Sequence, residues 1–330
     1  MHNASRTKTN ILNAVAIVLI VVFVLSAALL LLHIWEQKQG SAVVSDSMGS
    51  TIEYNGKDYV IKDSVETLLI LGLDKFEGSV TESSYNNDRQ ADFIMLLVVD
   101  NESESYKMVH INRDTMAEVN ILGVNGQKVD SVTKQLALAH TYGNGKKVSC
   151  RNVADSVSKL LMDINVNHYA SLTMDAVPVM TDLVSGVEVQ VLDDFSGIDD
   201  TLIKGEKVTL IGEHALNYVR TRYGLEDSSN ENRMKRQRQY LNALFEKTKA
   251  YAQNDENFIA EATYKMSDFL VSNRSATKLQ EVFEKITSYK YEGIIEIEGE
   301  LKKGEEFMEF YPDETSVKEI VIDLFYKEKE

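Results

Sequence analysis

Short apolar runs and amphipathic segments alternate along most of the chain. The runs typical of strands covered on both faces lie at 67–73, 93–99 and 108–111, and further strands are predicted at 169–173, 187–191 and 293–298. Helical periodicity is found at 131–141, 152–162, 175–183 and 316–326. This alternation predicts an α/β fold in which helices cover a central mixed sheet, in layers of the type α/β/α. No boundary signal divides residues 66–330, so one domain is expected there.

The amino-terminal segment is apolar in a different way, because residues 11–32 carry no charged side chain. About 20 apolar residues let a helix cross the ~30 Å hydrocarbon core of a bilayer. A cleaved signal peptide usually has a shorter apolar region, so we predict an uncleaved transmembrane anchor at 11–34. Because Arg6 and Lys8 precede it, we expect a cytoplasmic tail at 1–10 and an extracytoplasmic domain. The chain would then be a single-pass protein of the cell membrane.

The segment between the anchor and the domain, 35–65, is mostly polar and predicts a linker. Within it, the pair Asn55 and Gly56 lies between two short runs of strand-forming residues. An Asn-Gly pair favours the left-handed backbone of a tight hairpin turn. We therefore expect a hairpin near the end of the linker.

The composition excludes several classes of protein and site. The formal net charge is −16 and the isoelectric point is about 4.9, which argues against a nucleic-acid-binding protein because the phosphate backbone requires a basic surface. The single cysteine, Cys150, excludes an intramolecular disulfide and a cysteine-based zinc cluster, and we expect a structural thiol there. The spacing of one acidic group fits no calcium-loop motif, so a solvated loop is expected. This group comprises Asp193, Asp194, Asp199 and Asp200.

Against this acidic background, basic residues are concentrated in residues 216–239. They are Arg220, Arg222, Arg233, Lys235, Arg236 and Arg238. Ser228 or Ser229 is a suitable N-cap for a helix that reaches about Tyr251. At about 100° per residue, one helix face carries Arg233, Arg236, Gln237, Tyr240, Leu241 and Leu244, whereas Lys235 and Arg238 point away from it.

An arginine on a core-facing stripe costs free energy unless it meets an anion. The planar guanidinium group suits both phosphate and carboxylate. Two alternatives therefore stay open for Arg233 and Arg236. They bind an anionic ligand, or they form internal salt bridges with acidic residues of the chain.

Four motifs line up in order along the chain. They are LLILGLD ending at Asp74, DRQADFIMLL around Asp92, INRDT around Arg113, and YVRTR followed by NRMKRQ. In their order and spacing, these motifs resemble the LytR–CpsA–Psr family of bacterial envelope proteins. The resemblance covers roughly residues 66–250, together with the amino-terminal anchor.

The resemblance implies a phosphotransferase that attaches a glycopolymer to peptidoglycan in cell-wall or capsule assembly. Such a protein takes the glycan from an undecaprenyl pyrophosphate carrier, joins it through a phosphodiester and uses Mg²⁺. Its partners would be the polyprenyl pyrophosphate-linked glycan, the peptidoglycan acceptor and the membrane. The alternatives are a non-catalytic polyprenyl-pyrophosphate-binding protein of envelope assembly or regulation, and a lipid pyrophosphate hydrolase.

By resemblance, the motif residues fall into three groups. The metal ligands are Asp74 and Asp92, the catalytic residues are Arg113, Arg220 and Arg222, and the substrate-binding residues are Arg89, Arg233, Arg236 and Gln237. Metal and guanidinium charges suit attack at a pyrophosphate because negative charge builds up on its oxygens. The structural alternatives are strand-end turns for the aspartates, a pair with Asp114 for Arg113, and a solvated helix end for the paired arginines.

Two positions depart from the family pattern. Asn112 replaces a proline before Arg113, which loosens the backbone of that loop. Gln90 stands two residues before Asp92, where the family has an arginine, and Arg89 lies one residue further back. Because neighbouring strand residues point to opposite faces, Arg89 faces the site only if a bulge restores its direction.

A polyprenyl chain requires an apolar channel. The helices expected at 131–141 and 152–162 are candidates for its walls, and ordinary core packing is the alternative. The apolar residues concerned are Leu136, Leu138, Val153, Val157 and Leu161.

Overall fold

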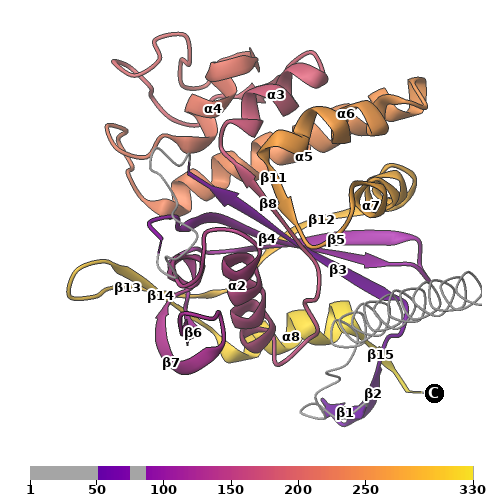
Figure 1. Cartoon of the computed structure of the whole chain (residues 1–330). Helices are drawn as coiled ribbons and strands as arrows, with labels where there is room; N and C mark the ends of the chain where they lie inside the picture. The colour runs from indigo at the N-terminus through magenta and orange to yellow at the C-terminus, as the bar shows by residue number, and fades with distance from the viewer. Residues whose placement is uncertain (1–50, 75–86, 330) are drawn as a thin grey trace, which may run out of the picture. The chain divides into compact units, whose positions relative to one another are not determined.

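A six-stranded mixed sheet lies at the centre of the computed structural model, which describes residues 51–74 and 87–329 (Figure 1). The strand order is β11-β8-β3-β4-β5-β12. The bounds are Val65–Leu73 for β3, Ala91–Asp100 for β4, Ser105–Ile111 for β5, Tyr169–Thr173 for β8, Leu270–Ser272 for β11 and Lys290–Glu296 for β12. Strand β4 is antiparallel to β3 and β5, whereas β8 runs parallel to β3 and β12 runs parallel to β5. The predicted central mixed sheet is therefore confirmed.

The central strands read as continuous apolar runs because both of their faces are buried. Successive side chains of a strand point to opposite faces. In β3, Leu69 and Leu71 belong to one apolar cluster, and Leu68 belongs to the cluster on the other face. In β4, Ile94 and Met95 divide in the same way. Core is thus built on both sides of the sheet, and helices must cover each side.

Helices form a layer on each face of the sheet (Figure 1). Those on one face are α2 (Lys147–Leu160), α8 (Glu314–Phe325) and the short 3-10 helix η1 (Leu136–Thr141). Those on the other face are α3 (Ala176–Leu183), α4 (Gly212–Arg220), α5 (Asn230–Asn254), α6 (Phe258–Met266) and α7 (Ala276–Ser288). This arrangement confirms the layered α/β architecture.

The helix predicted at 131–141 is wrong over its first half. Residues Lys128–Gln135 form strand β7, which pairs with strand β6 (Met116–Leu122) in an antiparallel hairpin. The pairing places Val132 opposite Val119, a contact between β-branched side chains that favours a sheet. The helical turn begins only at Leu136, in η1.

The described residues form three further small sheets besides the central sheet and the β6–β7 hairpin. The hairpin predicted at Asn55 and Gly56 is present as β1 (Thr51–Tyr54) and β2 (Lys57–Ile61), and both turn residues have positive φ angles, of 52° and 76°. Strand β2 also pairs with β15 (Tyr326–Glu328). The strand predicted at 187–191 is β9 (Val187–Gln190), but its pairing with β10 (Lys207–Leu210) and the hairpin β13–β14 (Gly299–Lys303, Met308–Pro312) were not predicted.

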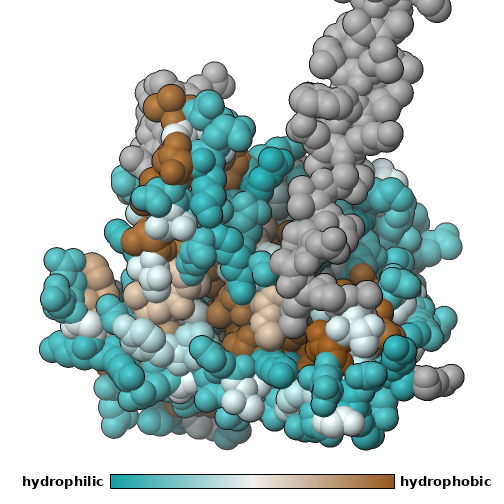
Figure 2. All heavy atoms as spheres, turned by 90° about the horizontal axis from the view of Figure 1, so that it is seen from below, coloured by the Kyte–Doolittle hydropathy of each residue, from teal (hydrophilic) through white to brown (hydrophobic). Residues whose placement is uncertain are grey.

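The predicted cytoplasmic tail at 1–10, the anchor at 11–34 and the linker as far as residue 50 lie outside the described residues. Within 51–74 and 87–329, no helix is long and apolar enough to cross a membrane. The face of the molecule seen from below is mostly hydrophilic, with scattered hydrophobic areas (Figure 2). Such a surface agrees with a chain of strongly acidic composition.

Candidate active site

The polar motifs meet at one edge of the central sheet. Because β3 and β5 are both antiparallel to β4, the ends of β3 and β5 lie beside the start of β4. Asp74 directly follows β3, Asp92 is the second residue of β4, and Arg113 comes two residues after β5. Ligand sites in α/β sheets commonly lie at such strand ends.

A β-bulge presents Asp92. Gly72 pairs with Phe93 and Leu73 pairs with Ala91, so Asp92 is the extra residue on β4. Bulges re-aim side chains and are frequent next to active sites. The side chain of Asp92 is only 10% exposed. It is therefore a nearly buried carboxylate that requires positive partners.

Arg113 is the main partner of Asp92, with which it forms an ion pair. Its Nε lies 3.3 Å from Oδ1 of Asp114, and its Nη2 donates a hydrogen bond of 2.7 Å to Oε1 of Gln90. Gln90, which replaces the arginine of the family pattern, therefore faces this cluster. The backbone N–H of Arg89 donates a hydrogen bond to Oδ1 of Asn87. Burial lowers the pKa of the Arg89 side chain. A substrate contact of Arg89 stays a prediction.

Asn112, the other departure from the family pattern, organises the turn that carries Arg113. Its Oδ1 accepts hydrogen bonds of 2.9 Å from the backbone N–H of Asp114 and from Nδ2 of Asn230. The first is the local side-chain contact that makes asparagine favourable in turns. The second ties the turn to the first residue of α5. A proline could make neither bond.

Arg233 approaches Asp92 from the second turn of α5. Its Nη2 lies 3.9 Å from Oδ1 of Asp92 and donates a hydrogen bond of 2.7 Å to Oδ1 of Asn230. Burial, together with the nearby charges of Arg113 and Arg222, lowers the pKa of Arg233 to about 10. The guanidinium still carries its charge at neutral pH. Crowded cations in a buried place favour an anionic ligand.

Arg220 and Arg222 complete the cluster from α4 and the residues after it. The helix ends at Arg220, and Thr221 has an extended backbone, so the two arginines are not confined to one helix side. Nε of Arg220 lies 3.3 Å from Oδ1 of Asp74, and both side chains are about half exposed. The guanidinium of Arg222 lies 4.5 Å from the centre of the Tyr223 ring. These arginines form the accessible side of the site.

Arg236 does not belong to this cluster, which contradicts its prediction as a substrate-binding residue. Its side chain is fully buried and forms an ion pair with Asp193. Its Nε donates to the carbonyl oxygen of Tyr218 at 2.8 Å, and its Nη2 donates to that of Thr221. The internal salt bridge was the alternative that the sequence left open. Asp193 is accordingly buried and is not part of a solvated loop.

The two neighbouring cations were predicted to point away from the stripe of Arg233 and Arg236, and only one of them is exposed there. Lys235 is half exposed and pairs with Glu231 one helical turn away. Arg238 is mostly buried and pairs with Glu296 at the end of β12. Periodicity predicted the face of α5 correctly for Lys235, but it could not indicate that β12 covers the other side.

An apolar cavity of about 250 Å³ adjoins the polar cluster. It lies between the central sheet and helices α3, α5, α6 and α7, and its walls are almost entirely hydrophobic. The walls include Gly72, Phe93 and Val219, the immediate or near neighbours of Asp74, Asp92 and Arg220. Gln237 also lines the cavity, with its Nε2 donating to the carbonyl oxygen of Val219 at 3.2 Å.

The cavity lies on the face of the sheet opposite to the predicted channel. Leu136, Val153, Val157 and Leu161 are fully buried in the packed core under α2 and α8, and Leu138 is partly buried beside them. The prediction of a channel there is therefore wrong. Both layers of this fold have apolar inner faces, and periodicity does not distinguish the packed face from the hollow one.

Asp74 and Asp92, the predicted metal ligands, are two of the carboxylates at the cluster. The described residues contain no group of three or more His, Cys, Asp or Glu side chains arranged for a metal. Mg²⁺ is commonly held by one or two carboxylates together with phosphate oxygens and water. Two carboxylates, each beside an arginine, fit that mode of binding, and the Mg²⁺ site stays a prediction.

The comparisons with known proteins all lead to one family. The model of the LytR_cpsA_psr family matches residues 36–320. The teichoic acid transferase TagU of Halalkalibacterium halodurans is 28% identical over 187 residues, which cover 56% of this chain and 54% of that protein. The cell wall biosynthesis protein LcpA of Corynebacterium glutamicum is 31% identical over 170 residues, which cover 46% of this chain and 32% of LcpA. The chain thus matches about half of TagU and a third of LcpA.

Solved structures show the same fold. TagT bound to LI-WTA has a TM-score of 0.59 at 24% identity, over 79% of this chain and 90% of TagT. TagV of B. subtilis has a TM-score of 0.58 at 22% identity, over 80% of this chain and 97% of TagV. At these identities the likeness establishes the fold.

Proposed function

Because the chain belongs to the LytR–CpsA–Psr family, we propose that it is a membrane-anchored phosphotransferase. It transfers a glycopolymer from an undecaprenyl pyrophosphate carrier to peptidoglycan. One observation carries the proposal, namely that a cluster of guanidinium groups adjoins an apolar cavity. A polyprenyl pyrophosphate has the same two parts, a dianionic head and a hydrocarbon tail. Its head would lie among the arginines, and the first part of its tail would enter the cavity.

The chemistry follows from the placement of these charges. A hydroxyl of the acceptor attacks the phosphorus next to the glycan, which forms a phosphodiester and releases polyprenyl phosphate. Negative charge builds up on the equatorial and leaving oxygens, and fixed cations lower its free energy. Arg113 and Arg233 are held rigidly by buried contacts, whereas Arg220 and Arg222 are accessible on the side from which an acceptor can approach. When bound at Asp74 and Asp92, Mg²⁺ would neutralise further charge on the pyrophosphate.

The products distinguish this proposal from its alternatives. The full-length protein in membranes would be incubated with lipid-linked glycan and peptidoglycan oligomers. A glycan joined to peptidoglycan through a phosphodiester is the expected product. Polyprenyl phosphate without a joined product would indicate a hydrolase, and unchanged lipid that stays bound would indicate a carrier-binding protein. Either of these results would overturn the proposed transfer.

We predict that Mg²⁺ binds only in the presence of a pyrophosphate. Isothermal titration calorimetry should detect binding with geranylgeranyl pyrophosphate present and none without it, because the phosphate oxygens complete the shell of the ion. Asp92→Ala should abolish this binding. Asp88→Ala, four residues earlier and exposed, is the control and should bind as the wild type does. Unchanged Mg²⁺ binding by Asp92→Ala would remove Asp92 from the metal site.

We also predict that a bulky side chain in the cavity weakens lipid binding selectively. Ala262 on α6 lines the cavity, whereas Ala260 on the same helix is exposed. Ala262→Trp should lower the affinity for geranylgeranyl pyrophosphate about tenfold or more, because excluding two methylene groups already costs about 1.6 kcal/mol. Its affinity for inorganic pyrophosphate should be unchanged, and Ala260→Trp should affect neither. An equal loss for both ligands would place the tail elsewhere.

A further inference from the structure

We propose that the buried pair of Arg236 and Asp193 is a positioning device for the arginine segment, residues 218–222. The functional meaning of this inference rests on the proposed function, since it concerns where Arg220 and Arg222 are held. The pair lies outside the cluster around Asp92, and no contact between the pair and Asp92 or Arg113 is found among the described residues. Its contacts instead run to the backbone at the end of α4.

Side chains of α5 satisfy the carbonyl groups at the end of α4. A helix end leaves its last carbonyls without intrahelical donors. Here Nε of Arg236 donates to the carbonyl of Tyr218 at 2.8 Å, Nε2 of Gln237 donates to that of Val219 at 3.2 Å, and Nη2 of Arg236 donates to that of Thr221. One rigid, planar guanidinium therefore spans both sides of the point where the helix stops. It fixes the direction in which the chain leaves α4.

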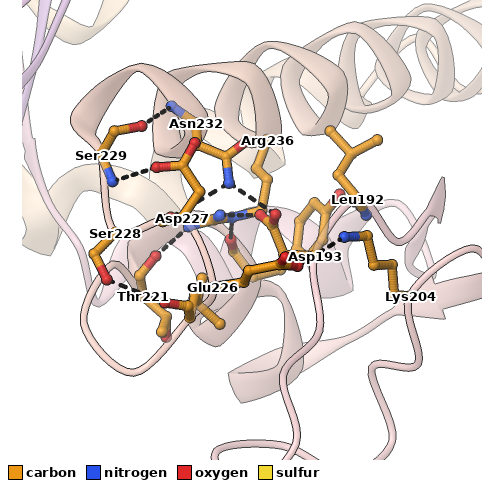
Figure 3. Close-up of polar contacts among 12 residues, drawn as sticks. Leu192, Asp193, Lys204, Thr221, Glu226, Asp227, Ser228, Ser229, Asn232 and Arg236 are labelled. Carbon is orange, nitrogen blue, oxygen red and sulfur yellow. Dashed lines mark hydrogen bonds and ion pairs between the residues drawn. The ribbon is translucent and has the colours of Figure 1, made fainter.

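Asp193 holds the guanidinium in this orientation. The residue lies in the loop after β9, and its carboxylate accepts from Nη1 of Arg236 and from Nδ2 of Asn232, the latter at 2.7 Å (Figure 3). The backbone N–H of Asn232 in turn donates to Oγ of Ser229, the N-cap of α5. The β9–β10 loop, the start of α5 and the end of α4 are thus joined at one buried point.

The two accessible arginines depend on this arrangement because the contacts of their own side chains are exposed. The side chain of Arg220 is about half exposed and contacts the equally exposed Asp74. A second contact, between Lys204 and Glu226, joins the β9–β10 loop to the loop between α4 and α5. This ion pair is exposed, and exposed pairs contribute little to stability. The position of Arg220 and Arg222 is therefore set mainly by the backbone of the arginine segment, which Arg236 holds.

Two variants separate a positioning role from a stabilising one. Asp193→Leu combined with Arg236→Met removes both charges and leaves apolar groups, an exchange that can restore stability lost in either single variant. Arg236→Lys keeps the charge opposite Asp193, but the ammonium group cannot reproduce the planar fork that reaches both carbonyls. Lys235→Met, on the exposed side of the same helix turn, is the control.

The full-length protein and these variants would be compared by melting temperature, by amide hydrogen exchange at residues 218–222, and by affinity for geranylgeranyl pyrophosphate. In the double variant and in Arg236→Lys, we expect exchange at least about tenfold faster in this segment and about tenfold weaker binding of the probe, whereas Lys235→Met should match the wild type in both. Wild-type exchange and affinity in Arg236→Lys or in the double variant would overturn the positioning role. A wild-type protein that does not bind the probe would overturn the proposed function, and the exchange data would still decide the role of the pair.

Discussion

Arg113→Met is expected to lower kcat/KM for glycan transfer by about 10²–10³-fold while leaving the protein folded. Arg113 contacts Asp92, Asp114 and Gln90, and it is the guanidinium with the most contacts in the cluster. In the proposed transfer, its charge would stabilise the leaving and equatorial oxygens of the pyrophosphate. The loss of one preorganised donor from such a place removes about 2.7–4 kcal/mol of transition-state stabilisation. Methionine keeps much of the apolar stem and removes the charge.

Arg274→Met is the matched control for this variant. Arg274 also forms an ion pair with a carboxylate, Glu66, and its side chain is 14% exposed, compared with 16% for Arg113. Melting temperatures should fall by similar amounts in the two variants, whereas activity per folded molecule should fall only for Arg113→Met. If both variants lose stability and neither loses activity, Arg113 serves only as the structural partner of Asp92 and Asp114.

Arg236→Met is expected to have the largest effect on stability, about 3–5 kcal/mol. The variant leaves the carboxylate of Asp193 buried without its positive partner, and it leaves the carbonyls of Tyr218 and Thr221 without a donor. In a domain of this size, each kcal/mol corresponds to roughly 2–4 °C in melting temperature, so a fall of about 10 °C is expected.

The comparison variant is Lys235→Met, one residue away. Lys235 is half exposed, and its pair with Glu231 is of the surface i,i+4 kind, which contributes less than about 0.5 kcal/mol. Calorimetry should therefore show almost no shift for it. A similar shift in both variants would indicate a general effect of charge on α5 and would contradict the importance of the buried pair.

Strands that are buried on both faces could be predicted from the sequence. The runs 67–73 and 93–99 lie inside β3 and β4, since continuous apolar residues have few other stable placements in an α/β domain. The helix prediction for 131–141 failed because strand β7 is specified by its pairing with β6, the preceding strand of the same hairpin, and not by the pattern of its own apolar residues.

The motifs also indicated which residues meet at the site. Asp92, Arg113 and Arg233 come together as expected from the order of the motifs. The stripe on α5 showed correctly that Arg236 is buried, but burial alone could not distinguish a ligand from an internal partner. The answer depended on Asp193, which lies 43 residues away and carries no recognisable motif.

The small sheet of β1, β2 and β15 has a mechanical consequence. This sheet contains the first and the last strands of the described chain, and in it Ile61 pairs with Tyr326. From there, β3 runs nine residues to the site, or roughly 30 Å at about 3.3 Å per residue. The site therefore lies at the end of β3 that is opposite to the small sheet. A change in the small sheet can therefore leave the distances within the catalytic edge unaltered.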